Sequence, residues 1–275
     1  MNNLLPRLLA SAPVLVCAVC GLAAPAAQSQ DWAKTILNKS PRHQEWVKVT
    51  YGSRTVSAFV VYPEVSHKAP VVLLIHEIFG LSDWARSMAD DIAAMGYIVI
   101  APDLLSGFGP NGGGTDAFPD MQSTTKAVSG LDAAGVTADL NAAADYALKL
   151  PAANGKLAVI GFCWGGGKSF AFATERKGLS AAFVFYGPPP STDSMKSITA
   201  PVYGFYAGND ARITLTVPAT KDAMAAAGKK YETVVYDGAG HGFMRAGEDP
   251  ANTNPANTTA RTEAMKRLET LFKGM

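Results

Sequence analysis

The sequence contains little cysteine. Three of its 275 residues are cysteine, and two of these, Cys17 and Cys20, lie in an apolar N-terminal segment. If that segment is removed, Cys163 stands alone and no disulfide can form within the chain. A lone cysteine in an exported protein is more often buried and inert than reactive. Cys163 therefore needs a motif around it before it can be considered a nucleophile.

Excess charge is also absent, with 24 lysines and arginines against 23 aspartates and glutamates. Proteins that bind nucleic acid or an anionic membrane surface usually carry an excess of basic charge. We therefore expect no nucleic-acid partner.

Histidine is scarce too: the four are scattered, and an H-E-x-x-H zinc motif beginning at His76 fails because Gly80 stands where the second histidine is needed. We expect no metal site.

Glycine-rich segments resemble nucleotide-binding loops, but their spacing is wrong. Residues 167–169, Gly-Lys-Ser, end like a phosphate-binding P-loop, yet Phe162 stands where the first glycine is required. The glycines of residues 107–112 match G-x-G-x-x-G by letter, but no helix can begin there before Pro119. The sequence thus lacks the dinucleotide loop of a cofactor-dependent oxidoreductase, and we expect no cofactor.

The N-terminal residues 1–27 have the three parts of a secretory signal peptide. A basic residue precedes an apolar segment at 8–22, and residues 24–26 form an A-x-A cleavage site. An uncleaved membrane anchor is the alternative, but Pro13 and the shortness of the apolar segment argue against a stable span. We therefore expect a periplasmic or secreted protein that has no membrane contact after cleavage.

Residues 28–275 alternate short apolar runs with segments of helical periodicity, which predicts a single α/β domain. Such a domain has a mostly parallel central sheet with helices on both faces. The predicted strands are 46–51 and 55–62, which form a hairpin, and 71–75, 97–101, 157–160, 181–186, 202–207 and 231–236. The predicted helices are 83–95, 136–150, 164–177, 217–227 and 258–272.

Two segments break this alternation. Residues 106–135 are rich in glycine and proline, and a long irregular loop in a compact domain usually has a function. We expect this insertion to form part of a lid. Residues 31–42 are polar and lack periodicity, so we expect them to lie on the surface.

Cys163 lies in a motif that changes the expectation for a lone cysteine. The strand at 157–160 leads into Gly-Phe-Cys-Trp-Gly at 161–165, the G-x-nucleophile-x-G pattern of a nucleophile elbow, and a helix follows. Small residues let the strand turn sharply into the helix and leave the thiol exposed. The unpaired N–H groups at the helix start favour a thiolate, and the Trp164 amide could stabilise an oxyanion.

Further reactive side chains follow the carboxyl ends of predicted strands, where open α/β sheets bind their ligands. Asp210 follows the strand 202–207 and His241 follows 231–236, so nucleophile, acid and histidine come in the order of α/β-hydrolase triads. His241 would accept the thiol proton and Asp210 would orient the imidazole. Asp237 competes for the acid role, but we favour Asp210 because its strand precedes the histidine strand.

Together these motifs resemble the dienelactone hydrolase family of α/β hydrolases. The resemblance covers about residues 46–272 and rests on His-Glu-Ile-Phe-Gly at 76–80, Ala-Pro-Asp-Leu at 101–104, Gly-Phe-Cys-Trp-Gly-Gly at 161–166, Phe-Tyr-Gly at 185–187 and His-Gly-Phe at 241–243. It implies the α/β-hydrolase fold, a triad of Cys163, Asp210 and His241, and an oxyanion hole formed by the Ile78 and Trp164 amides.

The resemblance also implies roles for Glu77 and Arg245. In such enzymes the glutamate lies beside the thiol and takes part in its activation when substrate binds, while its charge disfavours a free thiolate at rest. Arg245 matches an arginine that binds the substrate carboxylate. The position of a second such arginine reads Ser106-Gly107 here, so we expect an ester or lactone other than dienelactone itself.

The sequence therefore predicts an exported, monomeric hydrolase of a small-molecule ester or lactone that works through an acyl-cysteine intermediate. A thioesterase or a general carboxylesterase is the alternative with similar chemistry. A non-catalytic small-molecule-binding protein on the same fold is the alternative from another class, and the complete set of reactive residues counts against it.

Overall fold

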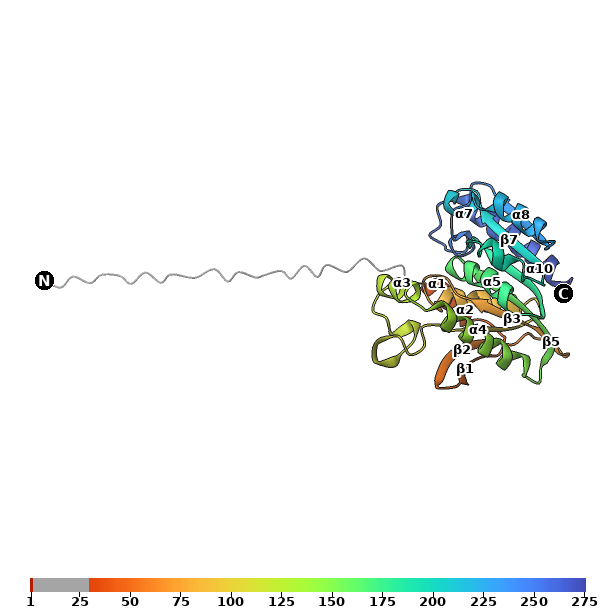
Figure 1. The fold of residues 1–275 in the computed structure, drawn as a ribbon. Coiled ribbons are helices and arrows are strands. Elements are labelled where there is room, and N and C mark those ends of the chain that lie inside the picture. Colours follow the sequence, from red (N-terminus) through yellow and green to blue (C-terminus); the bar gives the residue numbers. More distant parts are fainter. Residues whose placement is uncertain (2–29) are drawn as a thin grey trace.

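The computed structural model describes residue 1 and residues 30–275. Residues 2–27 of the predicted signal peptide, with Cys17 and Cys20, lie outside the described residues. The described chain forms an eight-stranded sheet in the order β1-β2-β4-β3-β5-β6-β7-β8 (Figure 1). The strands are β1 (Gln44–Tyr51), β2 (Arg54–Val61), β3 (Ala69–Ile75), β4 (Ile98–Pro102), β5 (Ala153–Phe162), β6 (Leu179–Phe185), β7 (Val202–Ala207) and β8 (Tyr231–Tyr236).

The strand directions agree with the sequence prediction. β1 and β2 form the predicted antiparallel hairpin, and β2 also runs antiparallel to β4. All other neighbouring strands are parallel. The parallel ladder brings the carboxyl ends of β3, β5, β7 and β8 to one edge of the sheet, and the predicted mostly parallel α/β sheet is confirmed.

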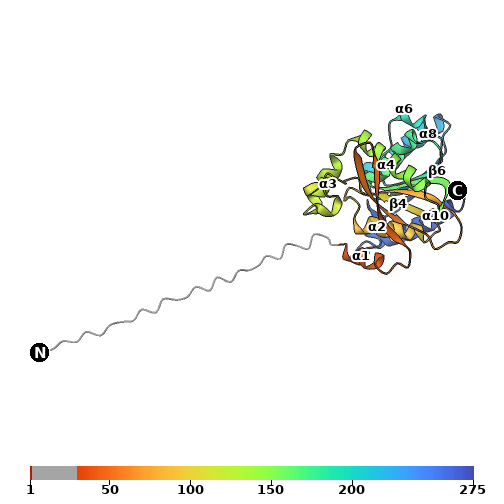
Figure 2. The ribbon, with the colours of Figure 1, turned by 90° about the horizontal axis from the view of Figure 1, so that it is seen from below.

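Helices cover both faces of the sheet, as predicted. They are α1 (Asp31–Leu37), α2 (Asp83–Ala93), α3 (Met121–Ser129), α4 (Ala133–Leu148), α5 (Trp164–Glu175), α6 (Thr192–Met195), α7 (Ala211–Thr214), α8 (Val217–Ala226), α9 (Phe243–Ala246) and α10 (Pro255–Phe272). α1, α2 and α10 pack on one face, while α4, α5 and α8 pack on the other (Figure 2).

The alternation of side chains along β3 shows why its sequence is continuously apolar. Val72 and Leu74 enter the core with α2 and α10, whereas Val71, Leu73 and Ile75 enter the core with α4 and α5. A parallel strand that is buried on both faces has no position at which a polar side chain could reach water. The same reason explains the apolar runs of β4 and β5.

The prediction for residues 31–42 placed them on the surface, where most of them lie, but missed a helix. Residues 31–42, expected as a polar surface segment, include helix α1. Its Ala33 and Leu37 are buried in the core beside α2. Trp32, Ala33, Ile36 and Leu37 recur at helical spacing, and this periodicity was missed because the segment is short and most of its other residues are polar.

The insertion at residues 106–135 was also expected to be irregular, and it is so only in part. It contains α3 and the first turn of α4. The Asp120 carboxylate accepts a hydrogen bond from the Ser123 amide and caps α3, which buries little more than Thr124 and Val128. The insertion stands out from the body of the fold at one end of the molecule (Figures 1 and 2).

Hydrogen bonds attach the base of the insertion to the body. The buried Asp103 carboxylate, just after β4, accepts bonds from the Thr115 amide at 2.8 Å and the Thr115 hydroxyl at 2.7 Å. The Leu81 amide donates to the same hydroxyl at 3.0 Å. Thr115 therefore joins the insertion both to β4 and to the loop after β3.

Within the part of the chain that the structure describes, no helix combines the length and hydrophobicity needed to cross a bilayer.

Candidate active site

The turn between β5 and α5 has the geometry of a nucleophile elbow. Cys163 has φ of 56° and ψ of −117°, a conformation that non-glycine residues rarely adopt. The glycines around it are required by close backbone contacts. A Cβ on Gly161 would lie 2.0 Å from the Gly165 carbonyl oxygen, and one on Gly165 would lie 2.3 Å from that of His76. The thiol therefore stands at the apex of the turn, at the carboxyl edge of the sheet.

A chain of hydrogen bonds joins Cys163, His241 and Asp210. The Cys163 Sγ lies 3.0 Å from His241 Nε2, and His241 Nδ1 lies 2.5 Å from Asp210 Oδ2. A carboxylate accepts, so Nδ1 donates its proton to Asp210 and Nε2 is free to accept the thiol proton. The carboxylate bonded to His241 is therefore that of Asp210, whose side chain is 7% exposed. Asp237, the competing choice in the sequence, is exposed.

Two backbone N–H groups face the thiol, those of Trp164 and Ile78. Burial raises the pKa of the Cys163 thiol to about 11, and the negative charge of Glu77 adds to the rise, whereas the two amides oppose it. The resting thiol is therefore protonated at neutral pH. A pair of N–H groups beside a nucleophilic atom is the arrangement that stabilises an oxyanion in acyl transfer.

Glu77 is buried beside the thiol, and Arg245 holds its carboxylate. Arg245 Nε donates to Glu77 Oε2 at 2.9 Å, and the Tyr186 hydroxyl lies 3.4 Å from Oε1. Burial raises the pKa of Glu77 above its usual value, and Arg245 opposes that rise. The arginine predicted to bind a substrate carboxylate thus binds Glu77 in this structure, and its guanidinium also lies over the Phe79 ring.

A second cation near the thiol, Arg212, was missed in the sequence. It lies in α7, two residues after Asp210, and its charge lowers the pKa of Cys163. Arg212 is exposed, and among residues 30–275 it has no ion-pair partner. Its position two residues after Asp210, the predicted acid, is the signal by which the sequence could have indicated it. The backbone at Ser106, where the family's second arginine was expected, instead accepts a hydrogen bond from Arg54, which is paired with Asp139.

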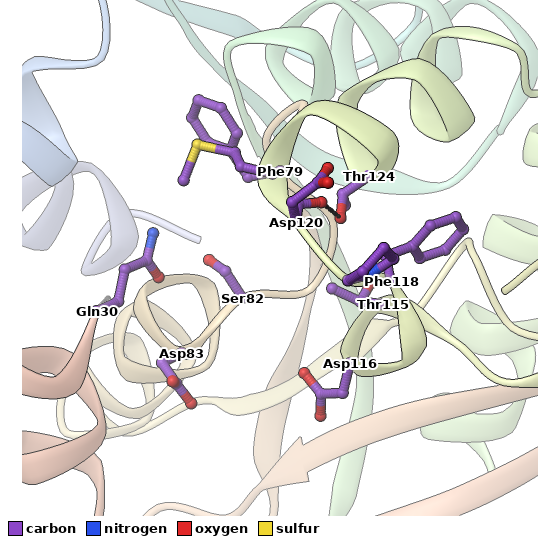
Figure 3. Close-up of a pocket in the computed structure, with 11 residues that line it drawn as sticks. Gln30, Phe79, Ser82, Asp83, Thr115, Asp116, Phe118, Asp120 and Thr124 are labelled. Carbon is purple, nitrogen blue, oxygen red and sulfur yellow. Dashed lines mark hydrogen bonds between the residues drawn. The ribbon is translucent and has the colours of Figure 1, made fainter. Parts of the chain in front are cut away.

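A pocket of about 320 Å³ lies between the loop after β3 and the insertion (Figure 3). Phe79 and Ser82 line it from the loop, and Thr115, Phe118 and Asp120 line it from the insertion. Phe118 also borders a larger, more apolar pocket of about 620 Å³ within the insertion. Phe79 connects the first pocket to the site through its contact with the Arg245 guanidinium.

No group of three or more histidine, cysteine, aspartate or glutamate side chains within the described residues is arranged to hold a metal ion. The elements around Cys163 are a strained elbow, a histidine bonded to a carboxylate, and two N–H groups directed at the sulfur. Such an arrangement on a parallel sheet with this topology is that of the α/β hydrolases.

Comparison with known proteins gives the family. The model of the dienelactone hydrolase family matches residues 56–275. A protein named "Putative carboxymethylenebutenolidase" from Methylorubrum extorquens is 29% identical over 240 residues, which cover 82% of this chain and 79% of that protein. One of the same name from Salmonella typhi is 34% identical over 202 residues, covering 68% and 72%.

Solved structures agree with the sequence relatives. A crystal structure titled as a putative dienelactone hydrolase from Klebsiella pneumoniae has a TM-score of 0.73 and 27% identity, and the match covers 85% of this chain and 99% of that one. The chain belongs to the dienelactone hydrolase family, and the resemblance seen in the sequence is confirmed.

Proposed function

We propose that this protein hydrolyses a carboxylic ester or lactone through an acyl-cysteine intermediate, with Cys163 as nucleophile, His241 as base and Asp210 as its orienting acid. The observation that carries the proposal is the Cys163 Sγ at 3.0 Å from His241 Nε2, with Nδ1 bonded to Asp210. Relatives named as carboxymethylenebutenolidases support a lactone or ester as substrate.

The reaction follows from this geometry. The thiol gives its proton to His241 as the sulfur attacks the carbonyl carbon, and the carbonyl π electrons move to an oxyanion that faces the Ile78 and Trp164 amides. The C–O bond to the leaving group then breaks as the imidazolium gives that oxygen its proton, and a thioester remains. Water, deprotonated by His241, attacks the thioester, and the sulfur leaves and regains a proton.

The Glu77–Arg245 pair supports a role for the substrate in activating the thiol. A substrate carboxylate that bound Arg245 would compete with Glu77 for the guanidinium and release a buried carboxylate beside the sulfur. Glu77 could then accept the thiol proton. Until that moment its charge keeps the thiol protonated, which would protect Cys163 from oxidation in an oxidising compartment.

Glutamine in place of Glu77 is expected to change two rates in opposite directions. Loss of the negative charge lowers the pKa of Cys163, so alkylation by iodoacetamide at pH 7 should become roughly 3- to 10-fold faster and its rise with pH should begin at lower pH. Ester hydrolysis should fall about 10-fold because the second proton acceptor is lost. Equal slowing of both reactions would contradict this role for Glu77.

Arg212 is expected to favour anionic substrates, since it is a cation near the thiol and forms no ion pair with the part of the chain that the structure describes. Matched esters, lactones and thioesters with and without a free carboxylate give the ratio of kcat/KM values. In Arg212→Gln this ratio should fall roughly 3- to 10-fold, whereas Lys156→Gln, at the amino end of β5, should leave it unchanged. An unchanged ratio in Arg212→Gln would contradict a role of Arg212 in attracting anionic substrates.

The same set of substrates separates the alternative functions. Preference for thioesters would support the thioesterase alternative, and no turnover of any substrate would support a binding protein.

We also propose that residues 1–27 direct export and are removed, so that a monomeric enzyme acts in the periplasm or outside the cell. The mass of the protein recovered from that compartment tests the cleavage. The insertion at 106–135 is proposed as part of a lid, because its residues line a pocket together with Phe79 and Ser82, in the segment that follows Ile78.

A further inference from the structure

His76 is a buried histidine that the reaction above does not use. Its side chain is fully buried between the end of β3 and the elbow. Nδ1 lies 2.7 Å from the Glu77 carbonyl oxygen, and Nε2 has no hydrogen-bond partner among the described residues. A buried polar atom without a partner costs free energy, so some other interaction of this side chain has to justify its presence.

The contact with Glu77 fixes the tautomer of His76. A carbonyl oxygen only accepts, so a 2.7 Å contact requires a proton on Nδ1. Burial lowers the pKa of His76, and the imidazole is therefore neutral, with an unprotonated Nε2. The ring is a single-proton donor directed at one carbonyl oxygen.

That carbonyl belongs to the peptide whose N–H group is the Ile78 amide. In a planar trans peptide the C=O and N–H bonds point in opposite directions. A donor that holds the Glu77 oxygen on one side therefore directs the Ile78 N–H to the other side, where Cys163 lies. The Gly80 amide donates to the same oxygen at 3.2 Å, so His76 supplies the shorter of two bonds.

His76 also packs against the other half of the oxyanion hole. Its ring stacks on the Trp164 indole with 5.6 Å between centroids and 12° between planes. Trp164 is the first residue of α5 and supplies the second N–H group that faces the thiol. One side chain thus contacts the carbonyl oxygen of the Glu77–Ile78 peptide and the indole of Trp164, and Ile78 and Trp164 carry the backbone N–H groups that would bind the oxyanion.

We propose that His76 is a positioning residue of the oxyanion hole: its Nδ1–H holds the Glu77–Ile78 peptide, and its ring holds Trp164, so that both amides converge on the same point. The inference rests on the proposed function, because an oxyanion forms only if Cys163 attacks a carbonyl. A polarised peptide is also a better donor, since a hydrogen bond to its C=O strengthens the bond that its N–H makes.

The test compares His76→Leu with His76→Asn. Leucine fills the space without a donor, whereas the asparagine amide nitrogen occupies about the place of Nδ1. For p-nitrophenyl acetate, His76→Leu should lower kcat about 10- to 100-fold with KM within about 2-fold, because the loss falls on the transition state. His76→Asn should recover kcat to within about 5-fold of the wild type. Equal losses in both variants, or a loss in KM alone, would overturn the proposal.

A measurement on the wild-type protein covers the case in which a variant fails to fold. The ¹⁵N chemical shifts of the His76 ring should report a neutral imidazole with its proton on Nδ1, and a proton on Nε2 would overturn the proposal. If the wild type hydrolyses no ester at all, the proposed function fails, whereas a wild type that is active with an unaffected His76→Leu variant removes only the role of His76.

Discussion

Alanine in place of Cys163 is expected to lower kcat/KM for activated aryl esters and small lactones by at least about 10⁴-fold. The thiol is the atom that would form the covalent bond, and no other described side chain lies within hydrogen-bonding distance of His241 Nε2. His241 and Asp210 would remain bonded to each other but would have no nucleophile to activate. Initial rates of the purified wild type and variant measure the effect.

The fold itself should tolerate this substitution. Cys163 is only partly buried, and its thiol makes hydrogen-bonding contacts only with His241 and with the Ile78 and Trp164 amides among the described residues. The melting temperature of the variant should stay close to that of the wild type, which separates loss of chemistry from loss of structure. Undiminished turnover by a folded Cys163→Ala variant would exclude the cysteine as nucleophile.

The second large effect is expected for Asp210→Asn. An asparagine at this position no longer favours a proton on His241 Nδ1, and it cannot balance the charge of the imidazolium that forms during the reaction. The expected loss in kcat is about 10³- to 10⁴-fold. Asp210 Oδ2 lies 2.5 Å from His241 Nδ1, so the variant changes a direct contact.

Asp237→Asn is the matched control, since this exposed carboxylate was the competing choice for the acid in the sequence. It should keep kcat within about 2-fold of the wild type, because surface substitutions away from such contacts have small effects. A large loss in Asp237→Asn with little change in Asp210→Asn would reverse the assignment of the acid.

Short-range patterns explain why much of the fold could be predicted from the sequence. The central strands are buried on both faces, so β3 and its neighbours read as apolar runs. The elbow is equally local: Gly161 and Gly165 are needed for backbone contacts within a few residues of Cys163 or with the adjacent strand. The order of Cys163, Asp210 and His241 then followed from the strands that precede them.

Contacts between distant residues could not be predicted in this way. Glu77 and Arg245 are far apart in the chain, and only the fold brings the guanidinium on α9 to the carboxylate after β3. The family resemblance therefore implied only a substrate carboxylate as the partner of Arg245. Likewise, the convergence of His76 on the Glu77 carbonyl and the Trp164 ring depends on β3 and β5 being neighbours.

The central claim is that a substrate acyl group is carried on Cys163. Rapid acid quenching of the wild-type enzyme during turnover of an activated ester, followed by intact-protein and peptide mass spectrometry, tests it most directly. We expect a mass increase equal to the acyl group minus one hydrogen, on the peptide that contains Cys163, and its absence in Cys163→Ala. Sustained hydrolysis with an acyl group on another residue, or with no acyl-enzyme at any quench time, would contradict the account.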